Sequence, residues 1–226
     1  MVTVLAAVFG GAAAAFVPRL AHRLAVPFGA PVRSTCAACT AALPSWVRVG
    51  APCPCQRPPV WTVTSGALVA GVLAATIGPA PLLVVLLLAT PVGLLLAAVD
   101  LRCLRLPDPL VALLAAVTVL PLGVVTVVTG DLGRPALAAL TGGAWYLAGH
   151  LLPRSPVGAG DVKLAVVLCF VLGFLGWPAV VAGLLTAHVI GGVVAVGLMI
   201  TRKADRRTPI PMGPLLLAGA VLGLSL

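Results

Sequence analysis

The sequence predicts an all-α protein, a polytopic membrane bundle of about eight transmembrane helices. Of its 226 residues, 61% are hydrophobic and only 8% are charged, whereas about a quarter of the residues of a soluble domain are charged. Long stretches such as 81–99 and 110–128 are almost wholly apolar and lack the alternation of transmembrane strands. Because one helical span uses about 20 residues, eight spans leave no room for a large soluble domain.

Proline, glycine and charged clusters divide the apolar sequence into its successive spans. The narrowest separations, Gly78-Pro79-Ala80-Pro81 and Gly176-Trp177-Pro178, are interpreted as tight turns, since a single helix from 62 to 99 would be too long for one span. The expected spans are 1–17, 62–78, 80–99, 109–129, 135–152, 162–176, 179–200 and 210–226.

The basic residues predict the orientation of the bundle. The net charge is +9, and with the N-terminus outside, every Lys and Arg except Arg134 falls in an inside loop, as the positive-inside rule requires. Both termini are therefore expected outside, and the first span is expected to be an uncleaved anchor because no basic residue precedes it. The cations are expected to meet anionic lipid rather than nucleic acid, because no basic stretch is interleaved with aromatic residues.

The first inside loop, about 18–61, carries four of the six cysteines, as Cys36-Ala-Ala-Cys39 and Cys53-Pro-Cys55. Disulfides are disfavoured on the cytoplasmic side, and two close cysteine pairs can present four thiolates to a structural zinc ion. The alternative is two pairs of free thiols, since CxC is less usual than CxxC. These features predict an N-terminal region, 1–61, that combines one helix with the cysteine loop, followed by a membrane-embedded region, 62–226.

Two aspartates mark span ends on the predicted cytoplasmic side. Asp100 ends the third span and Asp161 begins the sixth, and ionisable groups at such positions are costly unless they are paired or functional. Two carboxylates that share one proton can activate water and polarise a peptide carbonyl. Gly158 and Gly160 would allow a substrate backbone to approach Asp161 closely. Helix capping by Asp161 is an equal alternative, and Asp108 before a proline is typical of a helix start.

The ordered motifs around these aspartates resemble those of the bacterial prepilin peptidases, or type IV leader peptidases, of the GxGD aspartic protease group. They are Ala98-Val99-Asp100, Leu106-Pro107-Asp108, Gly158-Ala159-Gly160-Asp161-Val162-Lys163-Leu164 and Pro209-Ile210-Pro211-Met212-Gly213-Pro214-Leu215.

The resemblance implies a multi-pass enzyme of the bacterial cytoplasmic membrane that removes the short basic leader of a pilin or pseudopilin precursor. Asp100 and Asp161 would be catalytic, whereas Gly158, Gly160, Lys163 and Asp108 would lie around the substrate. Many members of the family also methylate the new N-terminus with S-adenosylmethionine, and the cysteine loop, with Cys36, Cys39, Cys53 and Cys55 as ligands to zinc, belongs to that bifunctional form.

The chain departs from the family pattern in the region tied to methylation. The second cysteine pair is CxC, the segment Arg57-Pro58-Pro59-Val60-Trp61 replaces one in which the family carries Glu, and the chain contains no Glu. Cleavage is therefore expected and methylation is left open. The alternative is a non-catalytic scaffold of pilus or secretion-system assembly, or a transporter, although a transporter would carry its acids nearer mid-span, usually with repeats and broken helices.

Overall fold

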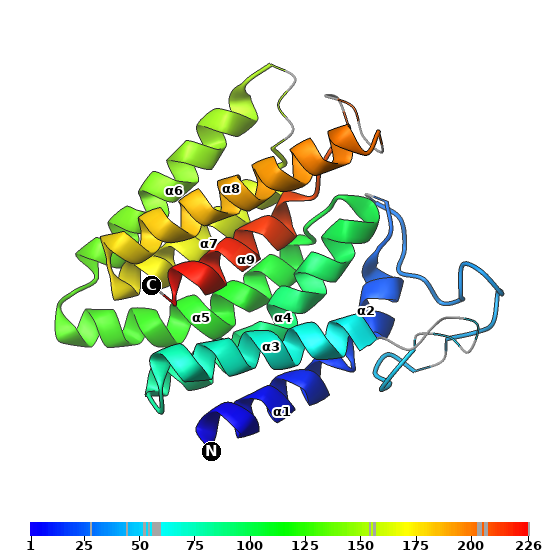
Figure 1. Cartoon of the computed structure of the whole chain (residues 1–226), viewed down its shortest axis with the longest axis horizontal. Helices are drawn as coiled ribbons and strands as arrows, with labels where there is room; N and C mark the ends of the chain where they lie inside the picture. The colour runs from blue at the N-terminus through cyan, green and yellow to red at the C-terminus, as the bar shows by residue number, and fades with distance from the viewer. Residues whose placement is uncertain are drawn as a thin grey trace. The chain divides into compact units, whose positions relative to one another are not determined.

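The computed structural model is helical throughout its regular parts (Figure 1). It describes residues 1–27, 29–43, 45–51, 53, 55, 60–153, 155, 157–202, 205 and 208–225. Within these residues the β structure is one isolated antiparallel bridge, between Thr35 and Ala42. The helices are α1 (Val2–Ala14), α2 (Val17–Leu24), α3 (Val60–Ile77), α4 (Pro81–Cys103), α5 (Asp108–Thr129), α6 (Gly133–Leu151), α7 (Ala159–Leu175), α8 (Trp177–Ile200) and α9 (Met212–Gly223).

The predicted all-α class is confirmed, and every predicted span coincides with a helix to within a few residues. Five helical segments are long and apolar enough to cross a bilayer, and α9 is a shorter apolar helix. The crossing of the membrane by eight segments stays a prediction. The five segments are Val2–Leu24, Val60–Ile77, Pro81–Cys103, Asp108–Thr129 and Trp177–Ile200.

The start of the cysteine loop differs from the prediction. Residues 17–24, expected to lie mostly in the loop, form the helix α2, in which Arg19, His22 and Arg23 are buried. Pro18 stands in the first turn, where its missing N–H costs nothing. Residues 57–59 of the segment Arg57-Pro58-Pro59-Val60-Trp61 lie outside the described residues, as do Pro54 and the cations Arg154, Lys203, Arg206 and Arg207.

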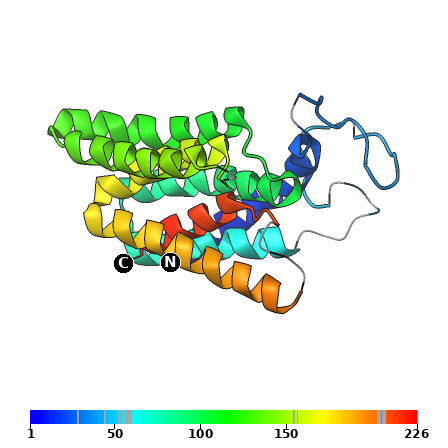
Figure 2. The same cartoon turned by 90° about the horizontal axis from the view of Figure 1, so that it is seen from above.

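The chain divides by packing into two compact units, and the first comprises Met1–Cys103. In this unit α3 packs against α1 and α4, and α2 packs against α4. The α1–α3 contact depends on glycine, because a Cβ atom on Gly10 would collide with the carbonyl oxygen of Gly66. Beyond α2 the chain continues as an irregular loop (Figure 2), which carries the cysteine pairs.

The second unit, Leu104–Leu226, is built around α7. Helix α7 contacts α5, α6, α8 and α9, and ten of its 17 residues are buried. Its C-terminal end is held by Arg134, whose Nε and Nη2 atoms donate to the carbonyl oxygens of Gly173 and Phe174 at 3.0 and 3.2 Å. Asp131 forms an exposed ion pair with Arg134 at 2.8 Å. The functional boundary at residue 61 stays a prediction, since packing divides the chain after Cys103.

Candidate active site and metal centre

The five acidic residues, all of them described, fall into two groups by burial. Asp100 is 4% exposed and Asp161 is 8% exposed, whereas Asp108, Asp131 and Asp205 are exposed to solvent. A carboxylate is costly to bury unless it has partners or is neutral. The two acids that the sequence selects as catalytic are therefore the two whose positions require an explanation.

Asp161 lies in the first turn of α7 and caps that turn. Gly158 is the N-cap residue, and its backbone N–H donates to Asp161 Oδ2 at 2.8 Å. The Asp161 N–H donates in turn to the Gly158 carbonyl oxygen at 3.1 Å. Gly158 has no side chain, so the one side-chain hydrogen bond of this cap is the bond that the Asp161 carboxylate accepts from the Gly158 N–H. The capping interpretation is confirmed, and the helix N-terminus favours the ionised form of Asp161.

The start of α7 also packs closely against the segment that leads into α5. A Cβ atom on Gly160 would lie 2.9 Å from the Cβ atom of Leu106, so only glycine fits there without a shift. Lys163 Nζ lies 2.7 Å from Asp108 Oδ1. The structure thus brings together Gly160, Lys163 and Asp108, which the sequence assigned to the substrate site. Asp108 begins α5 as expected, but its carboxylate forms an exposed ion pair with Lys163.

Asp100 lies in the N-terminal unit, three residues before the end of α4. Carbonyl groups at a helix C-terminus carry partial negative charge, so Asp100 and Asp161 lie at helix ends of opposite electrostatic sign. Two residues beyond it, Arg102 Nη1 donates to the Pro18 carbonyl oxygen of α2 at 3.4 Å. Asp100 and Asp161 belong to different packing units, so each is described within its own unit.

The four loop cysteines form one cluster, in which the four sulfur atoms all lie within 4.8 Å of one another. The Cys39 and Cys53 sulfurs are 3.2 Å apart, and those of Cys36 and Cys55 are 3.6 Å apart. Four sulfurs at about 2.3 Å around a tetrahedral zinc would be separated by about 3.8 Å. The observed spacing fits such an ion. The prediction that these four cysteines form a cluster able to hold a metal ion is therefore confirmed.

Local backbone structure shapes the first cysteine pair. The Cys36 N–H donates to the Ala41 carbonyl oxygen at 2.9 Å, and the Thr40 N–H donates to the Cys36 carbonyl oxygen at 3.0 Å. Thr40 adopts a left-handed conformation, with φ of 57°. This tight turn places Cys36 and Cys39 on the same side of the chain, as a shared ion would require.

The thiols of the cluster differ in their readiness to ionise. Backbone N–H groups of Ala38 and Cys39 donate to the Cys36 sulfur and lower the pKa of its thiol to about 6. Hydrogen bonds with Cys39, Cys53 and Cys36 raise the pKa of Cys55 to about 12. Metal ions bind the deprotonated form of cysteine. The Cys36 thiolate, with three thiols around it, therefore offers a cation its first ligand.

Comparison with known proteins agrees with the sequence motifs. The chain is 32% identical over 161 residues to a protein named "Prepilin leader peptidase/N-methyltransferase" from Aeromonas salmonicida strain A449, and equally to one of that name from Aeromonas salmonicida. The chain is a distant homologue of these two proteins. The matched region is 66% of this chain, and the chain spans about half the length of those curated relatives, 52%. No family model matches, and no solved structure matches.

Two arginines hold the cysteine loop, Arg19 and Arg23, which were interpreted from the sequence only as topology signals. Arg19 Nε donates to the Ser45 carbonyl oxygen at 2.8 Å, and Arg23 Nη1 donates to the carbonyl oxygens of Leu43 and, at 3.3 Å, Ser45. The Arg23 guanidinium also lies 4.2 Å from the ring centre of Trp46, a cation–π contact. The i, i+4 spacing of Arg19 and Arg23 could have indicated this shared role in the sequence, because it places both side chains on one face of a helix.

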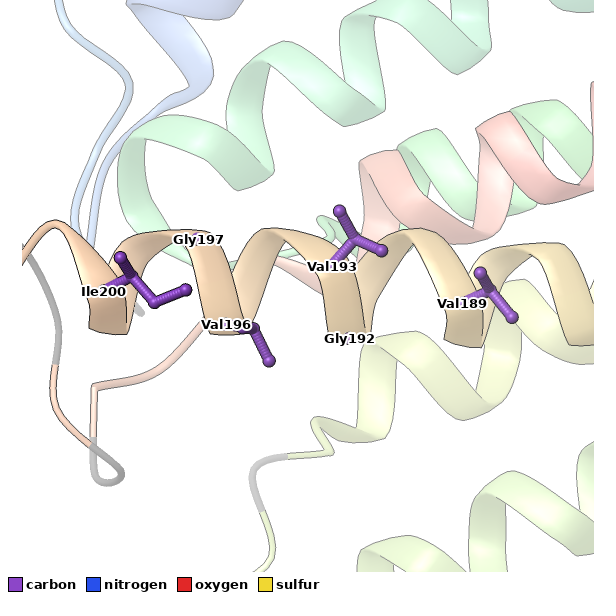
Figure 3. Close-up of a pocket in the computed structure, with 6 residues that line it drawn as sticks. All are labelled: Val189, Gly192, Val193, Val196, Gly197 and Ile200. Carbon is purple, nitrogen blue, oxygen red and sulfur yellow. The ribbon is translucent and has the colours of Figure 1, made fainter.

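A shallow groove on the C-terminal half of α8 is apolar throughout (Figure 3). A Cβ atom on Gly192 or Gly197 would meet no atom within 4 Å, so this face is open. None of its lining residues is titratable. The lining residues are Val189, Gly192, Val193, Val196, Gly197 and Ile200.

Proposed function

We propose that this chain is an intramembrane aspartic endopeptidase that removes the leader of pilin-like or pseudopilin precursors at the cytoplasmic membrane face. The observation that carries the proposal is that Asp100 and Asp161 are the two buried acids of the chain, each within a motif that resembles the family's. The name of the curated relatives supports the same activity. The predicted topology places both aspartates at the cytoplasmic edge.

The local environments suggest different roles for the two carboxyl groups. Asp161, at a helix N-terminus and with a backbone N–H donor, is suited to be the ionised base. Asp100, near a helix C-terminus, is suited to be the protonated acid. Asp161 would take a proton from a water molecule whose oxygen attacks the scissile carbonyl carbon, while Asp100 would donate a proton to the carbonyl oxygen. Collapse of the tetrahedral intermediate would break the C–N bond, with proton transfer to the leaving amine.

The residues around Asp161 are proposed to position the substrate. Close packing of Gly160 against Leu106 fixes the first turn of α7, and Gly158 presents no side chain beside the carboxylate. The exposed Asp108 carboxylate pairs with Lys163 and is available to exchange this partner for a basic residue of the leader. An apolar precursor helix would lie in the bilayer next to the enzyme.

The metal proposed for the cysteine cluster is zinc. Four sulfur donors suit a closed structural zinc site, and Cys36, Cys39, Cys53 and Cys55 would hold the ion. Zinc would supply folding free energy to a loop with little apolar core. The second activity named for the relatives, N-methylation, would require S-adenosylmethionine and is tested by the same assay as cleavage.

The test is cleavage of a pilin-like precursor in reconstituted membranes, with products identified by mass spectrometry. Both Asp100→Asn and Asp161→Asn are expected to abolish cleavage, whereas Asp205→Asn, at an exposed acid, should cleave as the wild type does. Methyl transfer would appear as the added mass of one methylene group when S-adenosylmethionine is present. Cleavage that survives both substitutions would refute the aspartic mechanism, and a folded wild type inactive on a panel of precursors would favour a scaffold.

A further inference from the structure

Three donor-bearing side chains of the N-terminal unit lie at or beside α2: His22, Arg33 and Arg102. Arg33 Nη1 donates to the His22 carbonyl oxygen, and Arg102 Nη1 donates to the Pro18 carbonyl oxygen, each at 3.4 Å. A guanidinium carries five N–H donors, and each of these two makes a single long hydrogen bond to the described residues. Most of their donor capacity is thus available to a ligand.

The charges around these side chains are unbalanced. The Arg33 and Arg102 guanidinium groups bond to carbonyl oxygens one helical turn apart on α2, those of His22 and Pro18, and both carry positive charge close to His22. No carboxylate of the described chain pairs with Arg33 or Arg102. Residues 1–103 contain six Arg residues and a single acid, Asp100. Like charges brought together in this way repel one another unless an anion lies between them.

The cluster also contains a buried, unsatisfied ring nitrogen. The His22 side chain is 5% exposed, and its Nε2 atom has no hydrogen-bond partner among the described residues. Buried polar atoms are almost always hydrogen-bonded. A ligand with several acceptor oxygens would satisfy this nitrogen, in its protonated tautomer, and both guanidinium groups together.

We propose that Arg33, Arg102 and His22 bind a phosphate group, supplied by an anionic phospholipid of the cytoplasmic leaflet. Planar guanidinium forks match phosphate oxygens in bidentate geometry. Arg102 follows the apolar stretch 81–99 of α4 almost directly, which places it at the depth of the lipid head groups. The bound lipid would tie α2 to the end of α4, two residues beyond Asp100.

The experiment compares lipid retention by the full chain in nanodiscs of phosphatidylcholine, with and without phosphatidylglycerol, using native mass spectrometry. The wild type should retain phosphatidylglycerol selectively. The double variant Arg33→Gln/Arg102→Gln should retain it about tenfold less per guanidinium contact removed, whereas Arg48→Gln, in the same loop, should behave as the wild type. Unchanged retention by the double variant would overturn the proposal.

Two further measurements separate folding and ligand source from lipid binding. The variant Arg33→Lys/Arg102→Lys keeps both charges but loses the forks, so it should show intermediate retention even if the Gln variant does not fold. Equal retention by the Lys variant and the wild type would argue against bidentate binding. Inorganic phosphate, added at millimolar concentration, should leave the lipid in place; displacement would assign the site to a soluble phosphate and overturn the lipid assignment. None of these measurements depends on peptidase activity.

Discussion

At the scale of single residues, Asp161 combines a structural contact with the proposed chemistry, and substitutions can separate the two. Asn retains an oxygen that accepts the Gly158 N–H, whereas Ala does not. We therefore expect Asp161→Asn to unfold at nearly the wild-type temperature and to lose cleavage. Asp161→Ala should lose cleavage and about 0.5–2 kcal/mol of stability. Thermal unfolding in detergent and the cleavage assay together check this. A stable, fully active Asn variant would leave Asp161 with capping alone.

The contact between Gly160 and Leu106 predicts a compensating pair of substitutions. Gly160→Ala brings a methyl group to 2.9 Å from Leu106 Cβ, and overpacking of this kind costs about 1–3 kcal/mol. Cleavage should fall because the first turn of α7 shifts. Gly160→Ala/Leu106→Gly removes the opposing Cβ and should recover activity relative to Gly160→Ala alone. Gly133→Ala, which meets no atom within 4 Å, is the control, and no recovery in the double variant would exclude steric displacement as the cause.

The cysteine cluster predicts a pH-dependent metal affinity. Metal ligation requires thiolates, and the pKa of Cys36, about 6, means that this thiol is already ionised above pH 6. Lowering the pH through 6 should therefore increase the number of protons released per zinc ion and weaken binding more steeply. Chelator competition at a series of pH values measures this, with Cys103→Ser as the control. The same slope on both sides of pH 6 would contradict an ionised Cys36.

At the scale of elements, apolar runs and glycine–proline breaks were sufficient to predict the helices, because lipid requires each spanning backbone to satisfy its own hydrogen bonds. The helix α2 was missed because its arginines suggested solvent, whereas in the structure Arg19 and Arg23 are hydrogen-bonded to loop carbonyl oxygens. The sequence around α2 gives no sign of such distant hydrogen-bond partners. The same reason explains why the motif residues Asp108 and Lys163 could be selected from the sequence while their ion pair could not.

Close contacts at glycine residues predict where a substitution would separate two packed helices. A Cβ atom on Gly219 of α9 would meet the Gly183 carbonyl oxygen and lie 2.8 Å from the Ala187 nitrogen, and these backbone atoms cannot move independently of α8. Gly219→Ala should separate α8 from α9 and destabilise the chain by about 1–3 kcal/mol. Gly197→Ala, on the open face of α8, should be neutral or slightly stabilising. Equal unfolding temperatures for the two variants would contradict the packing.

At the scale of the whole molecule, charge and hydropathy together predict the eight-span topology, which neither predicts alone. Hydropathy and length identify five spanning segments among the described residues, and the eight-span topology needs the segregation of the cations as well. With eight spans, the turn at Asp131 lies outside and the connection at Ser155 lies inside. A five-span chain could not keep every Lys and Arg except Arg134 on one side.

Thiol labelling in spheroplasts tests this topology directly. A reagent that cannot cross the membrane should label Asp131→Cys in intact spheroplasts, whereas Ser155→Cys should be labelled only after permeabilisation. The exposed thiols of Cys39 and Cys55 provide an internal reference, because the inside loop should protect them until the membrane is opened. Labelling of Ser155→Cys in intact spheroplasts would place the start of α7, and with it Asp161, on the outer side. The proposed cleavage could then not occur at the cytoplasmic face, so this result would reject the topology and the site assignment together.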